Sequence, residues 1–247
     1  MIAHITHKNK EFKVNLSKPI DISIPLKNGT DNPNAWYVPP VKMEAVKMED
    51  WVGEVKKGGS VNFFNIYFNP HGHGTHTECV GHISKDKESI NDSVKTFFFL
   101  SQLISVEPIA LKGDSIITKE SIEENFDEES EAIIIRTLPN STEKLNKHYS
   151  NTNPPFLQEE AAIYLREKGI KHLLIDLPSV DKEEDGGILA AHHAFWDFPK
   201  NTRFDCSITE LIFVPSEIKD GNYLLNLTFA PFDNDASPSR PTLYSIL

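Results

Sequence analysis

The sequence predicts an α/β protein that folds as a single domain over residues 1–247, with a mixed β-sheet and a few flanking helices. A chain of 247 residues is long enough to bury one sizeable core without disulfides, and it contains only two cysteines. Several short apolar runs are typical of strands that are buried on both faces of a sheet. Helical periodicity is confined to two segments in the second half of the chain.

The strands are predicted in chain order from two kinds of pattern. Alternation of apolar and polar residues predicts a strand over Ile20–Pro25 and another over Phe64–Phe68. Short apolar runs predict the later strands, which are Leu103–Val106, Ala132–Ile135, Leu173–Asp176, Leu211–Val214 and Tyr223–Phe229. These runs give the sheet both alternating and uniformly apolar strands.

The helices are predicted where apolar residues fall on one stripe. One helix is expected from Phe156 to Lys168, followed by Gly169 as a C-terminal cap, with its stripe formed by Leu157, Ala161, Tyr164 and Leu165. A shorter helix is expected over Leu189–Trp196. The acidic stretch from Glu120 to Glu131 is interpreted as a solvated helix face or loop.

The charge of the chain excludes some classes of partner. Lysine and arginine total 25 against 36 aspartates and glutamates, which gives a formal net charge of −11. Such a charge repels nucleic acid and anionic membrane surfaces, so neither is expected as a partner. The amino terminus lacks an apolar signal core, and no apolar run approaches the roughly twenty residues needed to cross a bilayer. We therefore expect a soluble, cytoplasmic protein.

The segment from His71 to His82 is the strongest functional signal in the chain. It places His71, His73, His76 and His82 within twelve residues of one another, together with Glu78. Imidazole nitrogens and a carboxylate suit zinc or manganese, and the intervening glycines allow a tight backbone. We favour this interpretation over a histidine-rich surface turn, because the acidic residue follows at short spacing.

Other familiar chemistries lack their motifs. The nearest approach to a serine-hydrolase elbow is Gly58-Gly59-Ser60-Val61-Asn62, which ends in the wrong residue. The chain has no phosphate-cradling Gly-Lys-Ser/Thr loop and no His-Glu-x-x-His helix, and Thr77 stands where a dinucleotide fingerprint needs its third glycine. Nucleotide-binding and thermolysin-type functions are therefore not expected.

The histidine segment resembles the His-x-Gly-Thr-His-x-Asp-x-Pro-x-His signature of the metal-dependent cyclase family, whose best-known members are bacterial kynurenine formamidases. The resemblance continues outside this segment, in Asp21–Leu26, Ala161–Gly169, Ile175–Asp181, His192–Trp196 and Glu210. It implies a cyclase-like swivelling β/β/α fold, in which the β core is barrel-like.

The resemblance also implies roles for individual residues. It implies four metal ligands, which are His76, Glu78, His192 and Glu210. It assigns proton donation and acceptance to His82. Trp36, in the loop after the first strand, matches an aromatic residue that contacts the substrate ring, although an aromatic side chain packed under a loop is an equally good interpretation. His192 is chosen over His193 because it aligns with the family pattern.

Three departures separate this chain from the family signature. Gly72 stands in place of the first motif histidine, Glu78 in place of the aspartate, and Val80 in place of the proline. The first departure leaves either one metal ion or a shifted chain in which His71 or His73 fills the gap. The second keeps the charge but lengthens the side chain by one methylene, which would move the ion or change how it is bridged.

These residues together imply an enzyme. A divalent metal, zinc or alternatively manganese, would activate a water molecule that attacks an amide carbonyl, and His82 would pass a proton to the departing amine. The resemblance implies a small-molecule amide substrate, namely N-formylkynurenine or a related aryl formamide, and a homodimer or higher homo-oligomer. The alternatives are an isatin-type cyclic-amide hydrolase and an inactive metal-binding protein of the same fold.

Overall fold

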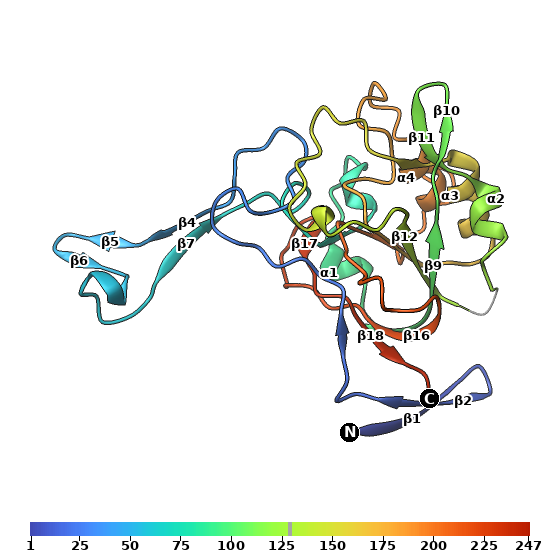
Figure 1. The fold of residues 1–247 in the computed structure, drawn as a ribbon, viewed down its shortest axis with the longest axis horizontal. Helices are drawn as coiled ribbons and strands as arrows, with labels where there is room; N and C mark the ends of the chain where they lie inside the picture. Colours follow the sequence, from blue (N-terminus) through green and yellow to red (C-terminus); the bar gives the residue numbers. More distant parts are fainter. Residues whose placement is uncertain (128–129) are drawn as a thin grey trace.

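A mixed sheet of nine strands forms the centre of the part of the chain that the computed structural model describes, residues 1–127 and 130–247 (Figure 1). Its four inner strands run parallel, and they are β9 (Phe98–Val106), β12 (Ala132–Thr137), β14 (His172–Ile175) and β15 (Ser207–Glu210). Every residue of β12 is buried, because neighbouring strands flank it and both faces of the sheet are covered.

Antiparallel strands extend this sheet at both ends. Beyond β15 lie β8 (His76–Glu78) and β17 (Ala236–Pro238). Beyond β9 lie β16 (Gly221–Asn226), β18 (Thr242–Ser245) and β3 (Ile20–Asp21). The sheet is therefore open, with β17 and β3 as its edges.

Two apolar layers pack on the two faces of the sheet, and helices contribute to both. The helices are α1 (Ile90–Ser93), α2 (Lys119–Glu123), α3 (Glu159–Glu167) and α4 (Ala190–Trp196), and single 3₁₀ turns cover Val55–Lys57, Val80–His82 and Thr142–Leu145. Figure 1 shows α2, α3 and α4 grouped together on one side. Leu165 and Trp196 from these helices are buried against Ile133 and Ile208 of the sheet. The opposite layer contains Ile22, Ile90, Leu225 and Leu243.

Smaller sheets lie outside this core. One joins β10 (Ile109–Leu111), β11 (Asp114–Ile117) and β13 (Phe156–Leu157), and an amino-terminal hairpin joins β1 (Ile2–His7) to β2 (Lys10–Asn15). A third segment, residues 42–67, projects away from the body as a long hairpin (Figure 1). We call it the arm, and its strands are β4 (Lys42–Ala45), β5 (Lys47–Met48), β6 (Trp51–Val52) and β7 (Phe64–Tyr67).

The predicted α/β class, with a mixed sheet and flanking helices, is confirmed. The strand expected over Leu211–Val214 is wrong: β15 ends one residue earlier, and Leu211 has a left-handed backbone with φ of 52°. The helix expected from Phe156 begins at Glu159 instead, because Phe156 and Leu157 pair with β11. No helix among the described residues has the length and hydropathy to span a bilayer.

The other expected elements differ mainly in their bounds. The strand expected over Ile20–Pro25 is a strand only at Ile20–Asp21, and the strand expected near Phe64 belongs to the arm. The acidic stretch, which was interpreted as a helix face or loop, begins in the short helix α2. Glu128 and Glu129 of that stretch lie outside the described residues.

Acid should destabilise the fold through His172. Burial, followed by the charge of Lys171, lowers the pKa of this imidazole to about 3, and the ring lies between Phe99 and the Ser207 hydroxyl. In the unfolded chain His172 binds a proton near pH 6.5, whereas in the folded chain it stays neutral until the pH approaches about 3. The free energy of unfolding should therefore fall by up to about 1.4 kcal/mol per pH unit as the pH drops from about 6.5 toward about 3.

Urea unfolding of the protein, followed across this acidic range, measures the effect. His172→Gln removes the titrating group while it keeps a polar side chain near Ser207, so its dependence on pH should be shallower than that of the wild type. Equal slopes in the two proteins would show that His172 does not control acid stability.

Candidate metal centre and active-site pocket

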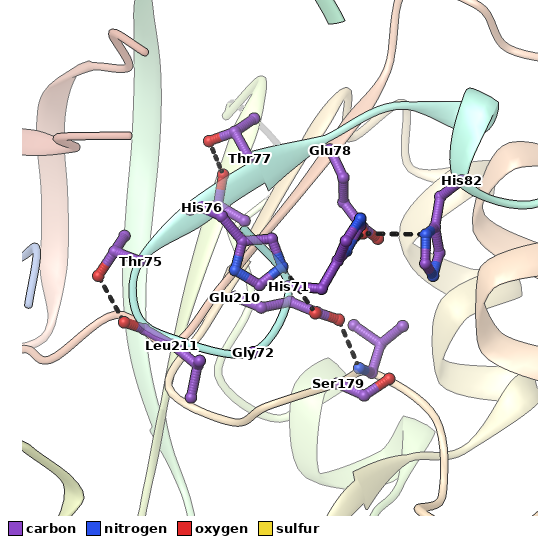
Figure 2. A network of polar contacts seen from close by, with 12 residues as sticks. His71, Gly72, Thr75, His76, Thr77, Glu78, His82, Ser179, Glu210 and Leu211 are labelled. Carbon is purple, nitrogen blue, oxygen red and sulfur yellow. Dashed lines mark hydrogen bonds and ion pairs between the residues drawn. The ribbon is translucent and has the colours of Figure 1, made fainter. Parts of the chain in front are cut away.

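Two adjacent antiparallel strands bring the first three predicted ligands together. His76 and Glu78 are two residues apart on β8, so both side chains point to the same face of the strand. Glu210 is the register partner of His76 on β15, and its Oε2 lies 3.3 Å from His76 Nε2 (Figure 2). The Thr75 hydroxyl donates to the Leu211 carbonyl at 2.5 Å, which fixes the start of β8 beside the end of β15.

His192 reaches the same place from α4. Asp181 caps this helix by accepting hydrogen bonds from the backbone N–H groups of Ala191 and His192, at 2.7 Å and 3.2 Å. The Asp181 carboxylate also contacts His192 Nδ1 at 2.5 Å, which turns Nε2 toward Glu78 Oε1 at 3.0 Å. His192 Nε2 lies 3.9 Å from Glu210 Oε1. Pairwise contacts therefore connect all four predicted ligands, but among the described residues no three candidate ligand atoms within 4.8 Å of one another include one from Glu210.

The orientation of His76 fits a bound cation. Its Nδ1 lies 2.9 Å from the Gly74 carbonyl, which can only accept, so Nδ1 carries the proton. Nε2 then faces the Glu210 carboxylate, and this buried nitrogen has no hydrogen-bond partner among the described residues. Two facing acceptors repel unless a proton or a metal ion lies between them, and metal-binding histidines commonly donate their other N–H to a carbonyl.

Glu78 lies at the centre of the cluster and, like His76, has a buried polar atom without a hydrogen-bond partner among the described residues. Its Oε2 is buried without a hydrogen bond, although His71 Nδ1 lies 3.1 Å away. Candidate ligand atoms within 4.8 Å of one another form two triads that share this carboxylate, one with His71 and His76 and one with His82 and His192. Nitrogen and carboxylate oxygen donors of this kind suit a divalent zinc or manganese ion.

The pKa values of the clustered side chains show that positive charge stabilises the buried carboxylates. Burial alone raises the pKa of Glu78, but the charges of His82 and His192 beside it hold its pKa well below the usual range. Burial likewise lowers the pKa of His192, yet contacts with Asp181 and Glu78 outweigh it and raise that pKa well above 6.5. Protons on the imidazoles thus balance the carboxylates, and a metal ion would compete with these protons.

His82 lies at the open side of the cluster. Its ring centroid is 4.4 Å from that of His71 and 5.4 Å from that of His192, and its side chain is 30% exposed. Its Nδ1 lies 3.3 Å from Asp235 Oδ2 and 3.8 Å from Glu78 Oε2. With Nδ1 directed at these carboxylates, Nε2 is the nitrogen left to exchange a proton with a bound molecule.

The structure distinguishes between the histidines that the sequence left open. His71 lies in the cluster, where Asp235 and Glu78 raise its pKa to about 10 against the opposing effect of burial. His73 lies elsewhere: Nδ1 accepts from the Asn69 N–H, and Nε2 donates to the Pro39 carbonyl. His193 also lies apart, with Nδ1 3.1 Å from the Phe198 carbonyl.

A cavity of about 280 Å³ opens over this cluster. Trp36 is part of its wall, and both Trp36 and Tyr37 adopt left-handed backbone angles, with φ of 60° and 58°. Such strained residues concentrate at functional sites. The other lining residues are Asn69, His71, His82, Ser179, Asp181, Lys182, Glu183, Asp185, Leu189, His192 and Glu210.

Two carboxylates of the site, Asp181 and Asp235, have no role that the sequence predicts. Asp181 was noticed only as part of the resemblance and received no role, yet it holds His192 in place. Asp235 was not noticed, because it lies far along the chain from the histidine segment in a stretch without a motif. No local spacing could have indicated the first, because Asp181 lies well before the start of α4, whose N-cap residue is Leu189.

Comparison with known proteins places the chain among relatives of similar length. A family model described as "Putative cyclase" matches residues 20–182. A kynurenine formamidase of Bacillus anthracis is 30% identical over 237 residues, covering 93% of this chain and 99% of that protein. The kynurenine formamidase of Bacillus mycoides strain KBAB4 is 31% identical over 238 residues, with the same coverage.

Solved structures share the fold. Isatin hydrolase A from Labrenzia aggregata superimposes with a TM-score of 0.65 at 18% identity, covering 93% of this chain and 94% of that chain. A structure described as a predicted metal-dependent hydrolase from Bacillus stearothermophilus gives a TM-score of 0.62 at 20% identity, covering 92% and 98%.

Proposed function

Since this chain belongs to the cyclase family, we propose that it is a metal-dependent amidohydrolase that cleaves an aryl formamide, with N-formylkynurenine as the leading substrate. The observation that carries this proposal is the cluster of His76, Glu78, His192 and Glu210. His192 and Glu210 of this cluster line a cavity that His82 also lines. The relatives at about 30% identity, named kynurenine formamidases, support the choice of substrate.

The four clustered residues are the proposed ligands of the metal, and zinc is the proposed ion, with manganese as the alternative. Two imidazoles and two carboxylates offer the nitrogen and oxygen donors that both ions accept. The orphaned His76 Nε2 and Glu78 Oε2 support this set. When bound, such an ion supplies Lewis acidity and an acidified water molecule.

Individual residues of the chain would then have separate roles in the hydrolysis. Water adds to the formyl carbon, the carbon–nitrogen bond breaks, and formate and an aryl amine leave. An amine departs poorly unless it is protonated, and His82, which lines the cavity beside the cluster, is the proposed carrier of the proton from the attacking water to that nitrogen. Asp181 keeps His192 oriented, and the buried strands around β8 exclude bulk water from the floor of the cavity.

Elemental analysis followed by a substrate panel tests this function. The purified protein is assayed for metal content and then with N-formylkynurenine, simple aryl formamides and isatin. Formate release with bound metal supports the proposal. Opening of the isatin ring without formate release would assign the cyclic-amide alternative, and bound metal without turnover on the whole panel would favour a binding protein.

Trp36 is proposed to contact the aromatic ring of the substrate, because its side chain forms part of the cavity wall. Trp36→Ala should raise KM for an aryl formamide about tenfold and change kcat little, since stacking stabilises the bound substrate and the transition state alike. Steady-state kinetics measure both constants. Phe204→Ala, at an exposed aromatic residue outside the cavity, is the control. An unchanged KM in the Trp36 variant would show that Trp36 does not contact the substrate and only packs under its loop.

The arm supports a proposed homodimer. Phe63, Phe64, Ile66 and Tyr67 are between 40% and 53% exposed along it, and exposed apolar surface of this kind commonly forms contacts between subunits. Light scattering should give twice the mass of the chain, and Ile66→Glu should shift it toward the monomer. Ile109→Glu, at an exposed residue of β10, is the matched control. A monomeric wild-type protein would refute the dimer.

A cytoplasmic location is also proposed. Both cysteines, Cys79 and Cys206, are buried free thiols, as suits a reducing compartment. Fractionation of the cells that produce the protein, with immunodetection of each fraction, would test this location.

A further inference from the structure

Asp235 connects two histidines that have different proposed tasks. Its Oδ2 lies 3.0 Å from His71 Nε2 and 3.3 Å from His82 Nδ1. The backbone holds this carboxylate firmly, because the Cys79 N–H donates to the Asp235 carbonyl at 3.0 Å and the next residue, Ala236, is the register partner of Glu78. The side chain is 20% exposed, so the contacts lie mostly out of solvent.

Gly72 explains why the neighbouring histidine occupies the cluster. A Cβ atom at residue 72 would lie 2.6 Å from Val38 Cγ2 and 3.1 Å from the Ala35 carbonyl oxygen. The Gly72 carbonyl also accepts from the Ala35 N–H at 3.0 Å. Residue 72 therefore packs against the turn of residues 35–38, and a side chain there would require the Val38 side chain to move and the Ala35 carbonyl to give slightly.

His71 takes the place that residue 72 leaves empty. Its Nδ1 lies 3.1 Å from Glu78 Oε2, and its ring centroid lies 5.2 Å from that of His76. Its side chain comes from the residue before the motif position, and Glu78 of the motif contacts only one of its two ring nitrogens. Asp235 contacts the ring nitrogen on the far side from Glu78.

We propose that Asp235 is a positioning residue that turns His71 into a metal ligand in place of the histidine missing at position 72, and that also orients His82 for proton transfer. An ionised carboxylate oxygen can accept two hydrogen bonds. His71 then donates from Nε2 and presents Nδ1 to an ion beside Glu78, while His82 donates from Nδ1 and keeps Nε2 for the substrate. One carboxylate thus couples the ligand set to the proton carrier.

This inference rests on the proposed function for the identity of the reaction, but its main test needs no substrate. Carboxylates that orient a ligand histidine typically contribute 10- to 100-fold to metal affinity. Zinc affinity, measured by competition with a chelator, should fall about 10- to 100-fold in Asp235→Asn. Asp233→Asn, at an exposed acidic residue two positions earlier, should bind zinc as the wild type does.

A double-variant cycle separates positioning from general damage to the fold. His71→Ala should lose affinity by itself, and adding Asp235→Asn to it should cost no more than about twofold further, because the ring to be positioned is gone. Nitrogen-15 spectra of the imidazoles give a second readout: protonation of His82 at Nδ1 in the wild type should be lost in Asp235→Asn.

Two results would overturn the inference. One is zinc affinity of Asp235→Asn within twofold of the wild type together with unchanged imidazole spectra. The other is an equal loss of affinity from Asp235→Asn with and without His71, which would mean that the carboxylate acts elsewhere. If the wild type binds zinc but hydrolyses no amide, the proposed function fails while these measurements still decide the role of Asp235.

Discussion

We expect His82→Ala to lose hydrolytic turnover by about 10²- to 10⁴-fold, the range contributed by a positioned acid–base group, while its metal content stays that of the wild type. The imidazole lies at the open side of the cluster with its Nδ1 directed at Asp235, so its removal takes away the proton carrier and leaves the buried ligands in place. Steady-state kinetics and elemental analysis of the same preparation measure the two quantities.

The control is His4→Ala, since His4 is an exposed histidine of the amino-terminal hairpin. It should match the wild type in both measurements. A His82→Ala protein that keeps most of its activity would show that another group moves the proton. Loss of metal along with activity would instead make His82 a ligand, a role that its place in the candidate triad with Glu78 and His192 allows.

A second large effect is expected at Glu78, the carboxylate shared by the two candidate triads. Glu78→Gln keeps the size of the side chain but removes the charge that offsets the surrounding histidines. A cation then loses a buried anionic ligand, and breaking such a pairing costs about 3–5 kcal/mol, which corresponds to a fall in metal affinity of at least about a hundredfold. Metal titration measures the affinity, and activity should fall with it.

Glu78→Asp is the matched comparison, because it keeps the charge and restores the acid of the family signature. It should retain the metal, while the carboxylate lies one methylene farther from His192 and turnover declines. A glutamine variant that binds metal as tightly as the wild type would remove Glu78 from the ligand set, whatever its effect on catalysis.

Much of the fold could be predicted from apolar patterns. Ala132–Ile135 and Leu173–Asp176 were recognised because a strand with both faces buried needs an uninterrupted apolar run. The same pattern is misleading at Leu211–Val214, where Leu211, Ile212 and Val214 are buried but the segment is not part of a strand. There the Leu211 and Ile212 N–H groups donate to Leu177 and Ile175 carbonyls as single contacts, so apolarity reports burial and not strand pairing.

Only part of the candidate site could likewise be predicted from the sequence. The spacing of His76 and Glu78 is a local property of a strand, and the sequence alone could predict that both point to one face. Asp235 has no such local signal, because it is one acidic residue among 36. It joins the site only because β17 pairs with β8, a contact between segments more than 150 residues apart.

The sequence by itself determined the chemistry available: a negatively charged chain with imidazoles and carboxylates at metal-binding spacing, and two further donors, His192 and Glu210, far along it. The tertiary structure alone decided that His71 and not His73 enters the cluster. His71 contacts Glu78 and Asp235 there, whereas both ring nitrogens of His73 are hydrogen-bonded elsewhere, to Asn69 and Pro39. Residue types fix which atoms can bind, but strand register and close packing fix which of them meet.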